Sequence, residues 1–267
     1  MSRESGTAYT MRPLLSVAPP YSPPVGEAFF WGAVGASALV LGAAIALVLP
    51  MGRHMLGLIL ALGSGVLISA VAFDLVEEAV DTSQGVGGVA LGLAAGALAF
   101  YVGDGFIDRM GGAERKSSTG GQAEGSGLAI VLGAVLDGIP ESIVLGIGLL
   151  AGVGVSVAFI VAVFVSNLPE GIAATTGLKA SGWAPRRVVG LWLLVALVSA
   201  LSSLAGFALF DTASDWTVAF VLAFAGGAVL TMLADTMMPE AFEHGGRQVG
   251  LVTTAGFAIA FALHMLE

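Results

Sequence analysis

The sequence predicts an all-α, polytopic membrane protein, and three observations lead to this prediction. Hydrophobic residues make up 57% of the chain and charged residues only 11%, and the mean hydropathy is +0.94. An ordinary water-soluble protein does not have this composition. Apolar runs of about 20 residues, the length that crosses the hydrocarbon layer as a helix, recur along the chain. The 39 glycines are spread through these runs, which favours close contact between helices.

Eight apolar runs are predicted to be membrane-spanning helices. Residues 1–27, which precede them, contain five prolines and lack the continuous apolar core of a signal peptide, so we expect a flexible tail outside the membrane. Residues 28–267 form the predicted transmembrane domain, with a Gly-, Ser- and Glu-rich cytoplasmic loop at 104–126. The predicted spans are 28–49, 55–79, 86–103, 127–149, 153–177, 187–209, 217–240 and 248–266.

The basic residues predict how the chain is oriented. With eight spans, the loops after the first, third, fifth and seventh lie on one side of the membrane. These loops hold all the basic residues except Arg3 and Arg12. The excess of Lys and Arg predicts that they are cytoplasmic and that both termini lie outside a plasma or inner cell membrane. Because cysteine is absent, disulfides and thiolate metal ligands are excluded.

Two short motifs place carboxylates at membrane depth. They are Asp137-Gly-Ile-Pro-Glu-Ser142 and Ser166-Asn-Leu-Pro-Glu-Gly171. An acid at the middle of a span opposes insertion by roughly 2.5 to 3.5 kcal/mol, so such residues usually face a partner, a cavity or an ion pathway. Each proline also removes a helical hydrogen bond, which predicts a bend. The motifs therefore predict an intramembrane cation site.

The spacing within the motifs identifies candidate ligands. Asp137 and Glu141 are four residues apart and share one helix face, and a hydroxyl, an amide and a carboxylate follow with similar spacing in the next span. An all-oxygen set without nearby basic or aromatic groups favours a divalent metal over an organic substrate. This metal would be transported cargo, with no cofactor expected. The predicted metal ligands are Asp137, Glu141, Ser166, Asn167 and Glu170.

Other acids are predicted to line a route to and from this site. One group lies at the outer end of the second span and the other at the inner end of the seventh, although solvated helix ends are an equally good interpretation. The three histidines are expected at the surface. The predicted pathway residues are Asp74, Glu77, Glu78, Asp235 and Glu240.

The sequence also contains weak internal repeats. A shift of 29 residues aligns Pro140 and Glu141 with Pro169 and Glu170, and a shift of 162 aligns Gly65 with Gly227. Inverted-topology repeats give such matches, and they place a binding site near the membrane midplane. Chance similarity between helices rich in Gly and Ala is the alternative explanation.

With these motifs, nearly the whole chain resembles the ZIP (Zrt/Irt-like) family of divalent-metal transporters. Ser166-Asn-Leu-Pro-Glu-Gly171 is similar to the family's His/Gln-x-x-Pro-Glu-Gly element, and Ala234-Asp-Thr-Met-Met-Pro-Glu-Ala241 is similar to its His-x-x-Pro-Glu-Ala element. The resemblance implies eight helices in a 3+2+3 inverted-repeat bundle, metal transport and a homodimer.

The chain departs from the family pattern at several ligand positions. Asp137 stands where the family usually has a metal-binding His, Gly138 replaces an Asn, and Ser166 replaces a His or Gln. The predicted site therefore lacks nitrogen ligands. Oxygen donors shift the preference toward harder ions such as Mn or Fe(II), while Zn stays within the range of such sites. Whether one or two metals bind is left open.

We therefore predict a transporter that moves Zn, Mn or Fe(II) toward the cytoplasm. The alternative is a membrane sensor or structural subunit that binds metal or protons without moving them. An intramembrane hydrolase would need a nucleophile and a base that the sequence does not offer convincingly, so no enzymatic activity is expected. The expected partners are the lipid bilayer, divalent ions and a second copy of the chain, with no nucleic acid.

Overall fold

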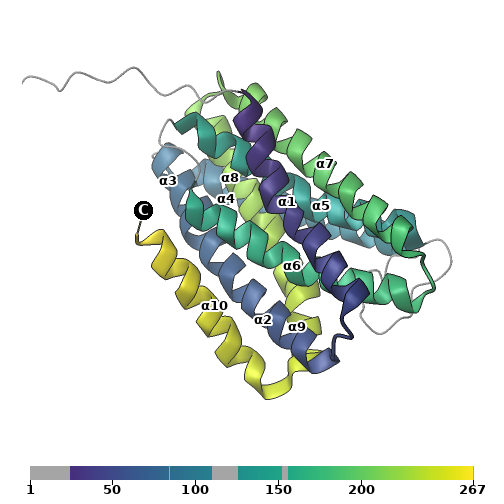
Figure 1. The fold of residues 1–267 in the computed structure, drawn as a ribbon. Coiled ribbons are helices and arrows are strands. Elements are labelled where there is room, and N and C mark those ends of the chain that lie inside the picture. The colour runs from purple at the N-terminus through teal and green to yellow at the C-terminus, as the bar shows by residue number, and fades with distance from the viewer. Residues whose placement is uncertain (1–24, 84, 110–125, 152–155, 267) are drawn as a thin grey trace, which may run out of the picture.

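The computed structural model describes residues 25–83, 85–109, 126–151 and 156–266, and all regular structure in these ranges is helical (Figure 1). The all-α prediction is confirmed. The main helical elements are α1 (Val25–Val48), α2 (Arg53–Ala70), η1 (Val71–Glu77), α3 (Glu78–Ser83), α4 (Val86–Ile107), α5 (Ser126–Gly148), α6 (Val157–Ala180), α7 (Pro185–Phe210), α8 (Asp215–Met232), η4 (Leu233–Met237), α9 (Met238–Gly245) and α10 (Val249–His264).

Most predicted span boundaries differ from the structure by a few residues, and two of the differences have a physical explanation. Helix α1 begins at Val25, three residues inside the predicted tail, and Glu27 in its first turn suits the positive end of the helix dipole. Helix α4 continues to Ile107, four residues beyond the predicted span, because Ile107 is itself buried in the bundle. The remainder of the predicted tail, residues 1–24, and positions 110–125 of the predicted loop lie outside the described residues.

Six described helical stretches are long and apolar enough to cross a membrane, so the chain is a multi-pass membrane protein. The predicted number of eight spans is not confirmed by this count. One of the six stretches, Asp215–His264, is 50 residues long and includes α8, α9 and α10. Between α9 and α10 the backbone turns at Gly246, with φ of 61°, and α10 then runs back beside α2 (Figure 1).

Five helix pairs make the most extensive contacts: α1 with α6, α1 with α7, α2 with α10, α4 with α8, and α5 with α7. In four of these pairs, all except α1 with α7, one glycine from each helix lies so close to the other helix that an added Cβ would collide with a backbone carbonyl. Small residues allow such close backbone approach in membrane bundles. The facing positions are Gly42–Leu168 and Gly171–Leu39, Gly65–Thr253 and Gly256–Leu62, Gly96–Phe224 and Gly227–Leu93, and Gly146–Ser203 and Gly206–Ile143.

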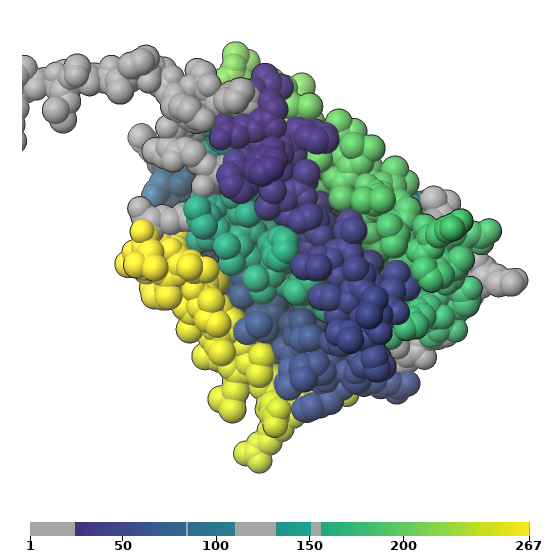
Figure 2. Space-filling model, viewed as in Figure 1, coloured from purple at the N-terminus to yellow at the C-terminus, as the bar shows by residue number. Residues whose placement is uncertain are grey.

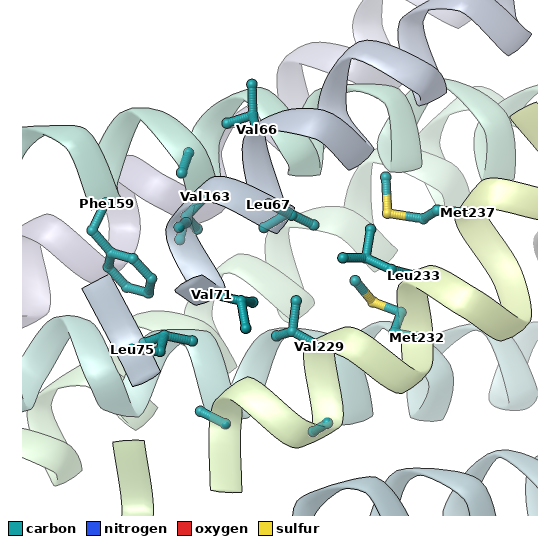
Figure 3. Close-up of a cluster of buried hydrophobic side chains, with 14 of the residues drawn as sticks. Val66, Leu67, Val71, Leu75, Phe159, Val163, Val229, Met232, Leu233 and Met237 are labelled. Carbon is teal, nitrogen blue, oxygen red and sulfur yellow. The ribbon is translucent and has the colours of Figure 1, made fainter. Parts of the chain in front are cut away.

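Side-chain packing joins these pairs to one another. On the face shown in Figure 2, α1 lies between α6 and α7, and α10 lies at the edge. Figure 3 shows apolar side chains from three different helix pairs meeting inside the bundle. We call this group the apolar cluster; it comprises Val66, Leu67, Val71, Leu75, Phe159, Val163, Val229, Met232, Leu233 and Met237.

Two helices of the bundle contain π-helical segments in corresponding positions. Segment η1 begins at Val71 in the α2–α3 helix and η4 begins at Leu233 in the α8–α9 helix. Their starts are 162 residues apart (233 − 71), which is the shift that aligns Gly65 with Gly227 in the sequence. The two helices therefore share a local distortion as well as a sequence pattern, as related repeat elements would.

The glycine contacts can be tested within a single helix. Gly96→Ala in α4 should destabilise the fold by about 1 to 3 kcal/mol, because its methyl group would meet the carbonyl of Phe224. Gly105→Ala in the same helix has open space around it and should leave stability equal or slightly higher. Thermal unfolding of the purified variants in detergent measures both effects. Equal melting temperatures would show that the α4–α8 contact tolerates a side chain.

Candidate functional site

A small cavity lies among the helices of the bundle. Its volume is about 30 Å³, enough for one or a few water molecules or a bare ion. We call it the central cavity. Its lining comes from α2, α5, α6, α7, η4 and α9, and comprises Leu60, Ala134, Asp137, Glu170, Ala173, Ala174, Trp192, Thr236, Met237 and Glu240.

Three carboxylates from three helices line the central cavity. Asp137 lies 11 residues after the start of α5, about 17 Å along the helix, and Glu170 lies 10 residues before the end of α6, about 15 Å from that end. Both are therefore deep in the bundle. Glu240 lies five residues before the end of α9. Because no basic side chain lines the cavity, its polar wall is acidic and suits a cation.

The structure brings two of the predicted ligands together at this cavity. Asp137 and Glu170 both line it, although they come from different helices. Glu141, one turn after Asp137, is only 4% exposed but is not part of the lining. Prolines 140 and 169 are both contained within continuous helices. The two acidic motifs thus face the interior, as their sequence predicts.

The other two predicted ligands make contacts elsewhere in the bundle. The Ser166 hydroxyl donates to the carbonyl of Val163 at 2.9 Å, within its own helix. The Asn167 amide donates to the carbonyl of Gly35 in α1 at 3.3 Å and so joins α6 to α1. Neither residue lines the central cavity. Their assignment as ligands stays a prediction that this arrangement does not favour.

The predicted pathway acids separate into different environments. Glu240 lines the central cavity, whereas Glu77, Glu78 and Asp235 are exposed. Asp74 lies at the other end of the bundle, where its carboxylate is 3.1 Å from the imidazole of His264. Glu240 is therefore a candidate member of the site itself, which its position at the end of a span did not indicate.

The surface prediction for the histidines is correct for His54 and wrong for His244. The His244 side chain is only 6% exposed, and its Nε2 atom lies 4.0 Å from Oε1 of Glu240. These residues are four apart in one helix, so the 3.6-residue period places them on the same face. His54, which is exposed, has its Nδ1 atom 3.3 Å from the carbonyl of His244. The acidic cavity is thus followed by the His244 imidazole toward this end, with His54 outside it at the surface.

The acids of the central cavity do not form a compact metal cage in this structure. Within the described parts of the chain, no three His, Asp or Glu side chains are grouped closely enough to hold one metal ion. Asp137, Glu170 and Glu240 share a cavity, but they would have to approach one another to coordinate the same ion.

The apolar cluster separates the central cavity from the Asp74 end of the bundle. Leu60 lines the cavity, and Asp74 lies 14 residues later, about 21 Å along the same helix. Leu67 and Val71 lie between them and pack in the cluster, together with Val229 and Leu233 of the facing helix (Figure 3). Apolar side chains offer no ligands to an ion, so this segment closes the bundle on the Asp74 side.

Comparisons with known proteins show the chain to be similar to zinc transporters. It is 28% identical over 206 residues to the zinc transporter GufA of Myxococcus xanthus, covering 73% of this chain and 80% of that protein. It is 27% identical over 236 residues to a protein of Arabidopsis thaliana named provisionally as a zinc transporter, covering 86% of this chain. The match spans only 37% of the Arabidopsis protein's length. No family model matches the chain.

One wall of the central cavity depends on a buried hydrogen bond. Trp192, which lines the cavity, donates its indole N–H to the Thr175 hydroxyl at 2.8 Å. Both side chains are almost completely buried. This bond orients the large indole ring beside the carboxylates, because a buried N–H without an acceptor is costly.

Thr175→Val tests this bond with little change of shape. The substitution should destabilise the protein by about 1 to 3 kcal/mol, because the buried indole N–H loses its acceptor. Thr176→Val is the matched control, since the Thr176 hydroxyl bonds only to the Ile172 carbonyl of its own helix. Thermal unfolding in detergent should show a clear drop for the first variant and little change for the second. Equal shifts would contradict this role for Thr175.

Proposed function

We propose that this protein is a transporter of divalent metal cations, with zinc as its foremost substrate, and that it moves them toward the cytoplasm. The observation that carries the proposal is the meeting of Asp137, Glu170 and Glu240 at one cavity deep inside a multi-pass bundle. Buried carboxylates from separate helices are costly to keep without a cation, which favours an ion-binding role over a structural one.

The chemistry of the cavity supports a divalent cation. Carboxylate oxygens bind Zn, Mn and Fe(II), and the cavity has room for one bare ion but not for an organic substrate. Zinc is placed first because both curated relatives described above carry zinc transport in their names. An ion of charge +2 would offset most of the repulsion among three carboxylates. Manganese and Fe(II) remain alternatives on donor chemistry.

The arrangement of the helices supports a transport cycle built on inverted repeats. We propose eight spans in a 3+2+3 arrangement, with α10 as a span of its own after the turn at Gly246 and α5 as a further span. In this arrangement, α2 corresponds to α8 and α10 to α4. The α2–α10 and α8–α4 pairs then occupy equivalent positions, and so do the α1–α6 and α7–α5 pairs.

The two ends of the bundle differ in polarity, and this difference supports a direction of transport. The apolar cluster closes the Asp74 side, whereas Glu240 and His244 continue from the cavity toward the end where Arg53 and Lys179 lie. Basic residues mark the cytoplasmic side of membrane proteins. We therefore propose an inward-directed route whose outer part is closed in this arrangement, with both termini outside.

A membrane sensor that binds metal without moving it is the competing function. Both functions predict metal binding at Asp137 and Glu170, but only a transporter moves ions into sealed vesicles. Uptake of radiolabelled zinc and manganese by vesicles containing the purified protein distinguishes them. Binding without time-dependent uptake would favour the sensor.

Removing the charge of Glu170 should abolish most transport. Glu170→Gln keeps the size of the side chain, and the initial rate of zinc uptake should fall at least about tenfold, because loss of one ligand costs on the order of 1.4 kcal/mol or more. Glu243→Gln, at an exposed position of α9, is the control and should leave uptake unchanged. Normal uptake by Glu170→Gln vesicles would remove this residue from the proposed site.

Glu240 should behave as a member of the site although it lies near a helix end. Glu240→Gln and Glu243→Gln are the same substitution three residues apart in α9, one lining the cavity and one exposed. We expect zinc uptake to fall about tenfold or more for the first and to remain normal for the second. If both variants transport normally, Glu240 only borders the cavity.

A further inference from the structure

A second polar group lies at the end of the bundle opposite the basic residues. The Asp74 carboxylate of η1 lies 3.1 Å from the His264 Nδ1 atom at the end of α10. The hydroxyl of Ser156, which precedes α6, lies 3.4 Å from the same carboxylate oxygen. Three elements that are distant in sequence therefore converge on one oxygen atom. The proposed transport function does not yet use this group.

The surroundings hold these side chains in place. The Asp74 side chain is 10% exposed and that of His264 is 30% exposed, so the group is sheltered but open to the outside. The Phe73 ring packs against the imidazole, with ring centres 5.4 Å apart. The Ser156 oxygen also accepts the backbone N–H of Phe159, which leaves its own proton to point toward Asp74.

We propose that Asp74 and His264, with the Ser156 hydroxyl, form an outer capture site for a divalent metal ion. This inference rests on the proposed transport function and assigns the place where the ion is first held. Carboxylate and neutral imidazole are both ligands of zinc, and a hydroxyl and water can complete the coordination. The central cavity has no such imidazole in its lining, so the outer site has a different donor set.

Two distances between the donor atoms are close to those that one metal ion requires. Zinc holds nitrogen and oxygen ligands at about 2.0 to 2.2 Å, so two ligands in tetrahedral geometry lie about 3.3 to 3.6 Å apart. The observed separations of 3.1 Å and 3.4 Å are close to this range. The bound ion would replace the hydrogen bonds that now join these groups.

The site is separate from the central cavity. Asp74 and the cavity residue Leu60 are about 21 Å apart along the helix, and the apolar cluster lies between them. With only two strong ligands, the outer site should bind an ion weakly, which suits a step where the ion is captured and passed on. Its loss should therefore change the concentration needed for transport more than the maximal rate.

Zinc uptake by vesicles tests the transport part of this inference. His264→Gln should raise the half-saturating zinc concentration about tenfold and leave the maximal rate nearly unchanged. His54→Gln, at the exposed histidine near the other end of the bundle, should change neither quantity. An unchanged half-saturating concentration in His264→Gln vesicles would overturn the proposal.

Chemical modification tests the site without relying on transport. Diethyl pyrocarbonate should modify His264 more slowly when zinc is present, and zinc should not protect His54, as read by mass spectrometry of the peptides. The measurement uses the wild-type chain and Glu170→Gln. Protection in both proteins without any zinc uptake would support the outer site and reject the transport function. Uptake without protection of His264 would reject the outer site alone.

Discussion

The structure depends on backbone contact between glycine-bearing helices. In a bilayer, apolar side chains gain little by leaving lipid for one another, so helix association relies on close packing and polar contacts. Four helix pairs here, α1–α6, α2–α10, α4–α8 and α5–α7, have a glycine from each partner against a carbonyl of the other. This reciprocal contact sets the distance between the axes of each pair. The positions of the acidic side chains follow from it, because α5 and α6 are each held by such a partner.

The two π-helical segments show where regular packing gives way to function. Such segments are often found at functional sites, because an extra residue in a turn re-aims the side chains around it. Segment η1 carries Asp74 toward His264, and η4 carries Thr236 and Met237 into the wall of the central cavity. Equivalent distortions thus serve opposite ends of the proposed route, as repeat elements of opposite orientation would require.

The sequence predicts the features that depend on local composition. Apolar runs predict the helices, and carboxylates within proline-containing motifs inside a span predict that Asp137 and Glu170 face the interior. Contacts between distant segments leave no periodic signal. For that reason the sequence predicts a pathway role for Glu240, which lines the same cavity, and a surface position for His264, which contacts Asp74. Asn167 looked like a ligand from its spacing, but Gly35 in another helix is its partner.

The difference between the two kinds of helix contact suggests how the bundle can move. Within a pair, each glycine lies against a backbone carbonyl of the partner helix. If one helix slid along the other, a larger side chain would meet that carbonyl, so each pair should move as a unit. Between pairs, there are close backbone approaches, of Gly57 in α2 to Gly245 in α9 and of Gly32 in α1 to α7. The apolar cluster makes the rest of the contact among α2, α6 and α8, and its side chains can change neighbours without losing hydrogen bonds (Figure 3). Rocking of the α2–α10 pair against the α8–α4 pair would open this cluster and join the Asp74 end to the central cavity. Because α6 packs against α2, movement of α6 together with α2 would also change the spacing of Glu170 in α6 and Glu240 in α9. In the proposed transport cycle, this movement would link closure of the cavity around an ion to opening of the outer route.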